Sequence, residues 1–207
     1  MGMKYKWYRL LQRYVHADYA RQKTVLSCQF KAHVASLPED QLAPRPAAVL
    51  ELACGDGNLA TVFPPESYLG LDLSTERIAA ARMGYPAYQF AVCDVAGEGF
   101  KNLLPNFDFI FCHGLLHHLD DKSCYELLAH IRLLAKKPTT FVAIEPVLPG
   151  MWQNPLGFLL AKLDEGHSIR PSQGYCSLFV GAFLEIEKLN LFPRWPVNME
   201  AYTVKYG

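Results

Sequence analysis

The chain has 207 residues, of which 51% are hydrophobic, and its formal net charge at pH 7 is +0. These values favour one globular domain with a substantial core. They exclude a global electrostatic attraction to nucleic acid or to an anionic membrane, and no stretch reaches the apolar length needed to span a bilayer.

The cysteines indicate the compartment. Cys54, Cys93 and Cys112 fall at expected strand ends, where a buried free thiol is the ordinary interpretation, and no metal-type C-x-x-C pair occurs. Free thiols favour a reducing compartment. Because basic residues interrupt any apolar run at the N-terminus, no signal peptide is expected. We therefore expect a cytoplasmic protein with no bound metal and no nucleic-acid or membrane partner, and the sequence leaves its oligomeric state open.

Residues 4–36 are predicted to be helical, in two segments. Apolar residues such as Tyr8, Leu11 and Val15 recur there at helical spacing. The basic residues of this segment favour a solvated helix face over a face for an anionic partner. Pro44-Arg-Pro46 then indicates a linker into the first strand.

Residues 49–60, Val-Leu-Glu-Leu-Ala-Cys-Gly-Asp-Gly-Asn-Leu-Ala, predict a short apolar strand, a glycine turn and a helix start. Gly55 and Gly57 leave no bulk over the turn, so a ligand can lie against bare backbone at the carboxyl end of the strand. The pattern through Ala60 also satisfies the dinucleotide fingerprint G-x-G-x-x-G/A. Glu51 and Asp56, however, would repel a pyrophosphate and favour a cationic ligand. S-adenosylmethionine, with its sulfonium and ammonium, suits this loop better.

Three more strands are predicted to follow in order. Residues 68–72 end in Asp72, residues 87–94 end in Asp94, and the strand that starts at Phe107 runs into a loop with three histidines. Helices are predicted between them, one capped by Ser74 and one that opens at Asp120 or Asp121, carries Leu127, Ile131 and Leu134 along one face, and stops near Lys136-Lys137. This alternation through residue 145 is typical of a parallel sheet with crossover helices.

Beyond the fifth strand the pattern changes. Residues 146–177 are rich in proline and glycine and hold one apolar helical patch, residues 156–163. Residues 183–192 and 201–206 are predicted to form a terminal antiparallel hairpin. The predicted fold class is therefore α/β: a Rossmann-like, seven-stranded, mostly parallel sheet with an antiparallel C-terminal hairpin and helices on both faces.

These motifs, in this order, resemble the class I S-adenosylmethionine-dependent methyltransferases of the small-molecule type, most strongly over residues 47–146. The resemblance implies a single domain: an N-terminal helical lid (1–46), a cofactor-binding core (47–145), a substrate-wall insertion (146–177) and a strand hairpin (178–207). It implies S-adenosyl-L-methionine as cofactor, with Asp72 at the ribose and Asp94 at the adenine amine. The cofactor-binding residues that it implies are Glu51, Ala53, Cys54, Gly55, Gly57, Asp72, Leu73, Asp94, Val95, Cys112 and His113.

Methyl transfer to an oxygen or nitrogen needs alignment of donor and acceptor and removal of one proton. Histidine is the natural base near neutral pH, so His117 or His118 is the candidate base, and Glu145 is expected to orient a histidine or to bind the acceptor. The spacing of His113 and His117 suggested a metal, but no carboxylate-rich site accompanies them. Trp152, Asn154, His167 and Arg170 are candidate acceptor contacts, although surface or packing roles are favoured for each.

The predicted function is S-adenosylmethionine-dependent methyl transfer to a small molecule. No Asn-Pro-Pro-Tyr or Asp-Pro-Pro-Tyr follows the fourth strand, which argues against methylation of DNA bases. Two alternatives are a nicotinamide-dependent oxidoreductase, which Glu51 disfavours, and a cofactor-binding protein of the same fold without catalysis.

Overall fold

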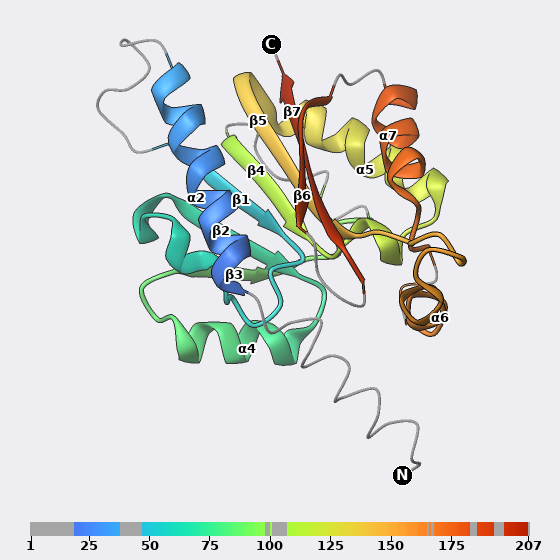
Figure 1. Cartoon of the computed structure of the whole chain (residues 1–207). Helices are drawn as coiled ribbons and strands as arrows, with labels where there is room; N and C mark the ends of the chain where they lie inside the picture. Colours follow the sequence, from blue (N-terminus) through green and yellow to red (C-terminus); the bar gives the residue numbers. More distant parts are fainter. Residues whose placement is uncertain are drawn as a thin grey trace.

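The centre of the molecule is a seven-stranded sheet with the order β3-β2-β1-β4-β5-β7-β6 (Figure 1). The computed structural model describes residues 19–37, 47–97, 100, 107–164, 166, 168–182, 186–192 and 197–206. The first helical segment predicted within residues 4–36, the linker at residues 44–46 and the side chain of His167 lie outside the described residues.

The first five strands run parallel to one another, and β7 alone is reversed in the sheet. Their bounds are β1 Val49–Leu52, β2 Tyr68–Asp72, β3 Gln89–Val92, β4 Phe107–His113, β5 Ala135–Pro146, β6 Ile186–Phe192 and β7 Met199–Tyr206. β1 pairs in parallel with β2 and β4, while β7 runs antiparallel to both β5 and β6. The predicted fold class, including the number of strands and the C-terminal hairpin, is confirmed.

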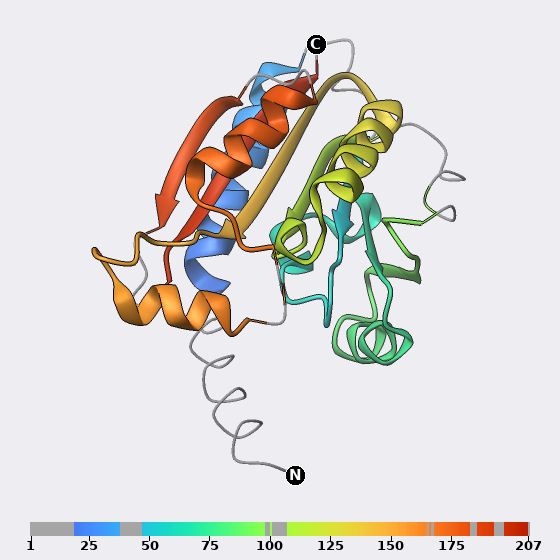
Figure 2. The ribbon, with the colours of Figure 1, turned by 90° about the vertical axis from the view of Figure 1, so that its right-hand side faces the viewer.

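Helices cover both faces of this sheet. They are α2 Tyr19–Ser36, α4 Thr75–Gly84, α5 Asp121–Leu134, α6 Pro155–Lys162 and α7 Ser172–Gly181, with short 3-10 helices η1 Ala60–Val62, η2 Pro65–Ser67 and η4 Leu116–His118. α5 and α7 share one hydrophobic cluster with the sheet, and α2 and α4 share the other. Figure 2 shows α5 and α7 in front of the sheet and α2 behind it. The arrangement gives three layers.

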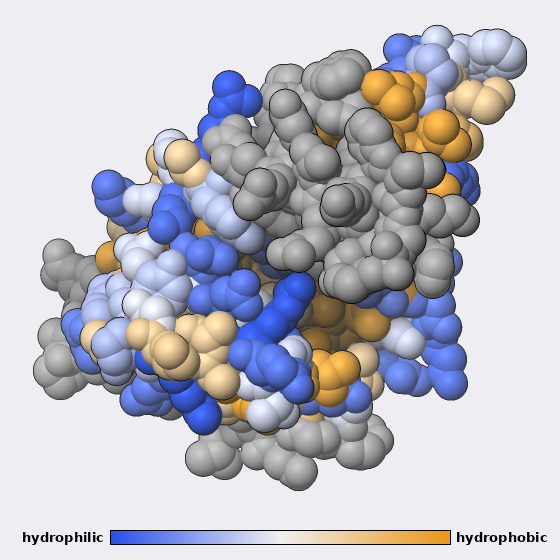
Figure 3. All heavy atoms as spheres, turned by 90° about the horizontal axis from the view of Figure 1, so that it is seen from below, coloured by the Kyte–Doolittle hydropathy of each residue, from blue (hydrophilic) through white to orange (hydrophobic). Residues whose placement is uncertain are grey.

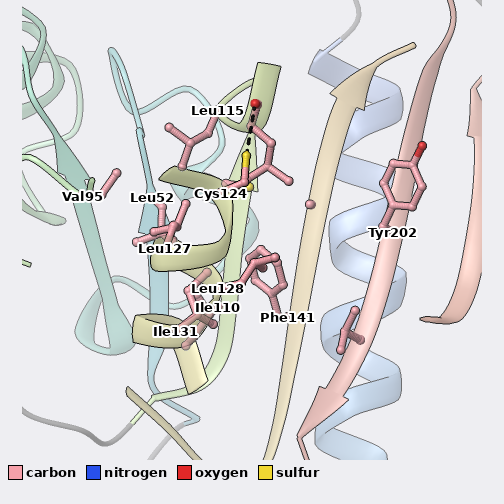
Figure 4. Close-up of a cluster of buried hydrophobic side chains, with 14 of the residues drawn as sticks. Leu52, Val95, Ile110, Leu115, Cys124, Leu127, Leu128, Ile131, Phe141 and Tyr202 are labelled. Atoms are coloured by element: carbon pink, nitrogen blue, oxygen red, sulfur yellow. Dashed lines mark hydrogen bonds between the residues drawn. The ribbon is translucent and has the colours of Figure 1, made fainter. Parts of the chain in front are cut away.

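Side chains that alternate along the buried strands fill the two clusters. On the α5 face, Leu127 and Ile131 pack toward Leu52 and Ile110 (Figure 4), and all four are at most 1% exposed. On the α2 face, Phe109 and Phe111 meet the buried face of the helix. Each such side chain contributes about 1.5–3 kcal/mol on burial, so the sheet is held rigidly between its helices.

The predicted helix starts are confirmed in detail. The Ser74 hydroxyl accepts a hydrogen bond from the Arg77 N–H at 3.2 Å, and the Asp120 carboxylate accepts one from the Ser123 N–H at 2.8 Å. α5 ends at Leu134, slightly earlier than predicted, and β5 begins at the next residue. The register of β4 and β5 then shifts before Thr140, because Pro138 lacks the N–H that a regular ladder requires.

Two local predictions were wrong. The turn after β1 leads into the short 3-10 helix η1 and not into an α-helix, because Pro64 and Pro65 follow within a few residues and stop it. α7 was not predicted, and the domain boundary set at Ser177 falls inside it. Tyr175, Leu178 and Phe179 carry the helical spacing that would have revealed it, but the flanking glycines and prolines obscured the pattern.

Among the described residues, no helix combines the length and the apolar character that crossing a membrane requires. All six cysteines are free thiols.

Candidate cofactor and acceptor site

The loop after β1 is held open by unusual backbone angles. Ala53, Gly55 and Gly57 have φ of 56°, 55° and 76°, a region that favours glycine. The Gly55 N–H donates to Asp72 Oδ2 at 2.8 Å, and the Ser74 N–H donates to Asp72 Oδ1 at 2.9 Å. Asp72 therefore ties the loop of β1 to the end of β2. Each of its oxygens keeps a second lone pair for a further donor.

The two glycines of this loop have different surroundings. A Cβ on Gly57 would lie 2.8 Å from Phe90 Cζ and 3.2 Å from Ala81 Cβ, so Gly57 permits close packing of the loop on β3 and α4. A Cβ on Gly55 would meet only the end of the flexible Arg77 side chain, at 3.3 Å. Gly57 is thus required by packing, whereas Gly55 keeps the loop surface bare.

Glu51 is buried beneath the loop, 2% exposed, and accepts a hydrogen bond from the Tyr68 hydroxyl. Burial raises the pKa of Glu51 to about 8; the Tyr68 hydrogen bond opposes this and the nearby Asp72 charge adds to it. At neutral pH the group is therefore mostly protonated. A cation held at the loop would favour its ionised form.

The remaining side chains that were predicted to bind the cofactor divide into exposed and buried groups. Leu73 is 67% exposed beside Asp72, and Asp94 is exposed with Oδ1 accepting the Ala96 N–H at 3.0 Å. Val95 and Cys112, by contrast, are packed in the cluster on the α5 face, and Cys54 is buried in the other. Only backbone atoms of these three can face a ligand without a rearrangement of the core.

The start of α2 lies over this edge of the sheet. The Tyr19 ring is 6.2 Å from the half-buried His113 ring, centroid to centroid. Burial raises the pKa of Tyr19, and a hydrogen bond to Asn58 acts in the opposite direction. The structure thus brings Tyr19, which lies in the segment predicted to be an N-terminal helical lid, next to the glycine loop. The tertiary fold, and no local motif, creates this contact.

Glu145, at the end of β5, organises the histidine loop. Fully buried, it accepts hydrogen bonds from the Leu115 and Leu116 N–H groups at 2.9 and 2.8 Å. Its second oxygen lies 2.8 Å from His117 Nδ1. Burial works against its ionisation, but these donors prevail and lower the pKa of Glu145. Of the two roles predicted for Glu145, the geometry favours that of orienting a histidine. Because Glu145 is fully buried, it does not face an acceptor.

His117 lies between two carboxylates. Its Nε2 is 3.7 Å from Asp164 Oδ1, and Gly166 packs against its ring. If Nδ1–H donates to Glu145, Nε2 carries the lone pair that a base requires. His118 is exposed, with its ring centroid 4.1 Å from that of His117. Asp164 was not identified from the sequence, because nothing local indicates that the end of α6 reaches the histidine loop.

The other candidates have varied positions. Trp152 is 90% exposed, and the Asn154 side chain caps α6 by accepting the Gly157 N–H at 2.8 Å. Arg170 is engaged in internal hydrogen bonds to the histidine loop and to Asp121. Asp108 accepts a hydrogen bond from the Ala48 N–H at 2.7 Å, at the opposite end of the sheet. No cluster of metal-ligating side chains occurs within the described part of the chain.

Comparison with known proteins adds a domain assignment to this geometry. Residues 50–140 match the family model of a methyltransferase domain. Residues 50–140 thus form a methyltransferase domain. The resemblance to S-adenosylmethionine-dependent methyltransferases is thereby confirmed, and the domain match covers the glycine loop, Asp72, Asp94 and the histidine loop.

Two trans-aconitate 2-methyltransferases are similar to the methyltransferase domain. The enzyme of Methylobacterium nodulans (strain LMG 21967 / CNCM I-2342 / ORS 2060) is 37% identical over 78 residues, which are 36% of this chain and 29% of that protein. The enzyme of Variovorax paradoxus (strain S110) is 31% identical over 107 residues, 50% of this chain and 36% of that protein. The matched segments thus span about a third of the length of these curated relatives.

Solved structures support the fold. An S-adenosylmethionine-dependent methyltransferase from Clostridium acetobutylicum ATCC 824 superposes with a TM-score of 0.72 at 14% identity, covering 100% of both chains. Magnesium protoporphyrin IX methyltransferase from Synechocystis PCC 6803, solved with bound S-adenosylmethionine, gives 0.64 at 13% identity, covering 95% of this chain and 83% of that one. The described part of this chain therefore has the fold of these methyltransferases.

Proposed function

We propose that this protein transfers a methyl group from S-adenosylmethionine to an oxygen or nitrogen of a small molecule. The observation that carries the proposal is the bare glycine loop braced by Asp72 above the buried Glu51. The loop presents backbone to a ligand, and the two carboxyl groups favour a ligand that brings positive charge and hydrogen-bond donors.

The residues present fit this cofactor. When bound, S-adenosylmethionine supplies a methyl group on a positively charged sulfur, which an acceptor lone pair can attack. Gly55 and the adjoining backbone would hold its methionine part, with Glu51 ionising beneath it. The second lone pairs of Asp72 would accept from the ribose hydroxyls, and Leu73 and Asp94 would meet the adenine.

A dinucleotide suits this loop less well. Pyrophosphate binding relies on the N-terminus of an α-helix after the glycine turn, where several N–H groups and the helix dipole converge. Here the turn leads into the three-residue η1. The antiparallel β7 between β5 and β6 also departs from the dinucleotide-binding strand order. These features disfavour the oxidoreductase alternative.

We assign the role of base to His117, with Glu145 as its positioning residue. The 2.8 Å contact fixes Nδ1 toward Glu145 and leaves Nε2 for the acceptor proton. Once Nε2 is protonated, the Asp164 carboxylate 3.7 Å away stabilises the resulting imidazolium. His118 is exposed, with its ring packed against that of His117, so it serves as the matched control.

The experiment is methyl transfer from labelled S-adenosylmethionine to a panel of small hydroxyl and amine compounds. For an acceptor that is turned over, His117→Gln should lower kcat about a hundred- to ten-thousand-fold, the contribution typical of a positioned base, and His118→Gln should leave it nearly unchanged. Equal, full turnover by both variants would remove His117 from the mechanism. Binding of the cofactor without turnover of any acceptor would instead favour the non-catalytic alternative.

The free thiols of all six cysteines remain in accord with the expected reducing compartment, and we place the protein in the cytoplasm on that ground. A small-molecule acceptor, with no nucleic acid or membrane as partner, is part of the same proposal.

A further inference from the structure

α6 and its C-cap expose three leucines, while the small residues of the helix are buried. Leu156, Leu159 and Leu163 are 44%, 55% and 65% exposed, whereas Gly157 and Ala161 are buried. The three leucines recur at i, i+3 and i+7, so they form one apolar stripe along the outer face of the helix. Trp152, 90% exposed, lies in the turn before α6. An outward row of this kind is characteristic of a binding surface.

This apolar stripe begins beside the proposed base. Leu163 immediately precedes Asp164, whose Oδ1 is 3.7 Å from His117 Nε2. Gly166 then packs against the His117 ring. The stripe therefore extends away from His117 along α6, which rises about 12 Å over its eight residues. Figure 3 shows apolar residues gathered at the corner of the molecule that α6 occupies, on the face with the carboxyl ends of the parallel strands.

The charge that faces His117 Nε2 is negative. It belongs to Asp164, and a second carboxylate, that of Asp120, is exposed at the start of α5, directly after the histidine loop. The neighbouring Asp121 is paired with Arg170. Fixed carboxylates at this position repel an acceptor that carries several carboxylates of its own. They do not repel an uncharged one.

Among the described residues, Arg170 places a positive charge on the histidine loop, and its hydrogen-bond donors are already occupied. Arg170 Nη1 donates to the Leu116 and Ser168 carbonyls at 2.9 and 3.0 Å. Nη2 donates to the Leu119 carbonyl at 2.9 Å and to Asp121 Oδ1 at 2.6 Å, and Nε donates to the same oxygen at 3.0 Å. These contacts occupy all five guanidinium donors, so Arg170 has none to offer to an anionic acceptor.

A lipid bilayer fits the stripe less well than a single molecule does. Helices that lie on membranes carry several basic residues on their polar face. α6 has Lys162, whose ammonium lies 5.8 Å from the centre of the Phe158 ring, and no second basic residue.

We propose that the methyl acceptor is an uncharged molecule with an extended apolar part that lies along Leu156, Leu159 and Leu163, with its reactive group at His117. This inference rests on the proposed function and names the substrate class of the same site. It separates this protein from an enzyme whose acceptor is a tricarboxylate.

The test measures binding of three probes to the full chain saturated with S-adenosylhomocysteine. 4-Octylphenol has an uncharged head and an apolar tail, 4-octylbenzoate has the same tail with an anionic head, and trans-aconitate has three carboxylates and no tail. We expect 4-octylphenol to bind most tightly and trans-aconitate not to bind. With S-adenosylmethionine in place of S-adenosylhomocysteine, trans-aconitate should not be methylated. Leu159→Gln should raise the Kd of 4-octylphenol about five- to tenfold, because burial of one leucine is lost.

Leu133→Gln is the matched control, because Leu133 is also exposed, 71%, but lies on α5 away from the stripe. It should leave the Kd nearly unchanged. Equal effects of the two substitutions, or preferential methylation of trans-aconitate, would overturn the inference. If Leu159→Gln turned a dimer into a monomer in sedimentation, the stripe would bind a second copy of the chain, and the inference would be overturned. If Leu159→Gln abolished flotation with lipid vesicles, the stripe would bind a membrane, which would overturn it as well.

The two proposals fail in different ways. If S-adenosylhomocysteine binds normally and 4-octylphenol does not bind, only the acceptor class is wrong. If S-adenosylhomocysteine itself does not bind, the proposed function is wrong. Because Leu159 is exposed, its substitution does not endanger folding, and the cofactor measurement on Leu159→Gln verifies this.

Discussion

At the scale of single residues, Glu51 connects the fold to the ligand most directly. Its carboxyl group is buried, and its pKa is raised from 4.5 to about 8. The unfolded chain ionises this group above about pH 4.5, whereas the folded protein keeps it protonated until about pH 8. The stability that it contributes is therefore fully present below pH 4.5 and is lost as the pH rises through 8.

Glu51→Gln removes this titration and keeps a similar shape. We expect the difference in free energy of unfolding, variant minus natural protein, to increase as the pH rises from 5 to 8. The shift in the pKa of Glu51 limits this increase to at most about 5 kcal/mol. Urea denaturation at pH 5, 6.5 and 8 measures the difference. Glu126→Gln, at an exposed site on α5, should show no such trend. A constant difference across this range would contradict a protonated Glu51.

Gly57 shows a packing requirement within a ligand loop. Gly57→Ala places a Cβ 2.8 Å from Phe90 Cζ at a φ of 76°, so we expect the free energy of unfolding to fall by about 1–3 kcal/mol. Gly84→Ala meets nothing within 4 Å at the end of α4 and should be neutral or stabilising by up to about 1 kcal/mol. Thermal unfolding of both variants distinguishes them; similar losses for both would show that the contact at Gly57 is unimportant.

At the scale of elements, the sequence predicts those whose pattern is local. The alternation of apolar strands with helices, together with the caps Ser74 and Asp120, was enough to predict β1 to β5, α4 and α5. The α-helix expected after the glycine loop does not form, because Pro64 and Pro65 stop it after one short 3-10 turn. α7 was missed because the glycines and prolines around it obscured the spacing of its buried residues, which pack against Tyr202 of β7.

Arg170 links the insertion to the histidine loop, so its replacement tests how these elements are joined. Arg170→Lys has too few donors, and too compact a head, to reach both loop carbonyls and Asp121. We expect the free energy of unfolding to fall by about 1–3 kcal/mol and the Leu116 and His117 amides to exchange faster with deuterium.

Arg82→Lys provides the comparison, because Arg82 also donates to a backbone carbonyl, that of Phe90, but on β3. It should weaken the protein without affecting exchange at the histidine loop. If Arg170→Lys leaves the exchange of these two amides unchanged while the protein stays folded, the link is not needed to hold the loop.

At the scale of the whole molecule, the candidate site was predicted in outline and not in its contacts. The carboxylates at the strand ends follow from sheet topology, so Asp72 and Glu145 could be found from the sequence. Asp164 could not, because the fold brings it to the site from the end of α6, whereas Tyr19 was expected only as part of the N-terminal lid, to which α2 belongs. The burial of Cys112 was expected from its place at a strand end, whereas that of Val95 was not, since it depends on how α5 packs.

The central claim is that the loop braced by Asp72 binds S-adenosylmethionine. Calorimetric titration with S-adenosylmethionine and with its demethylated product should show binding that Asp72→Asn weakens by at least about tenfold, because a charged hydrogen-bond acceptor is lost. Asp108→Asn alters a similarly buried carboxylate, 3% exposed, at the opposite end of the sheet and should leave the Kd nearly unchanged. Absence of binding by the natural protein, or equal weakening by both substitutions, would contradict the account.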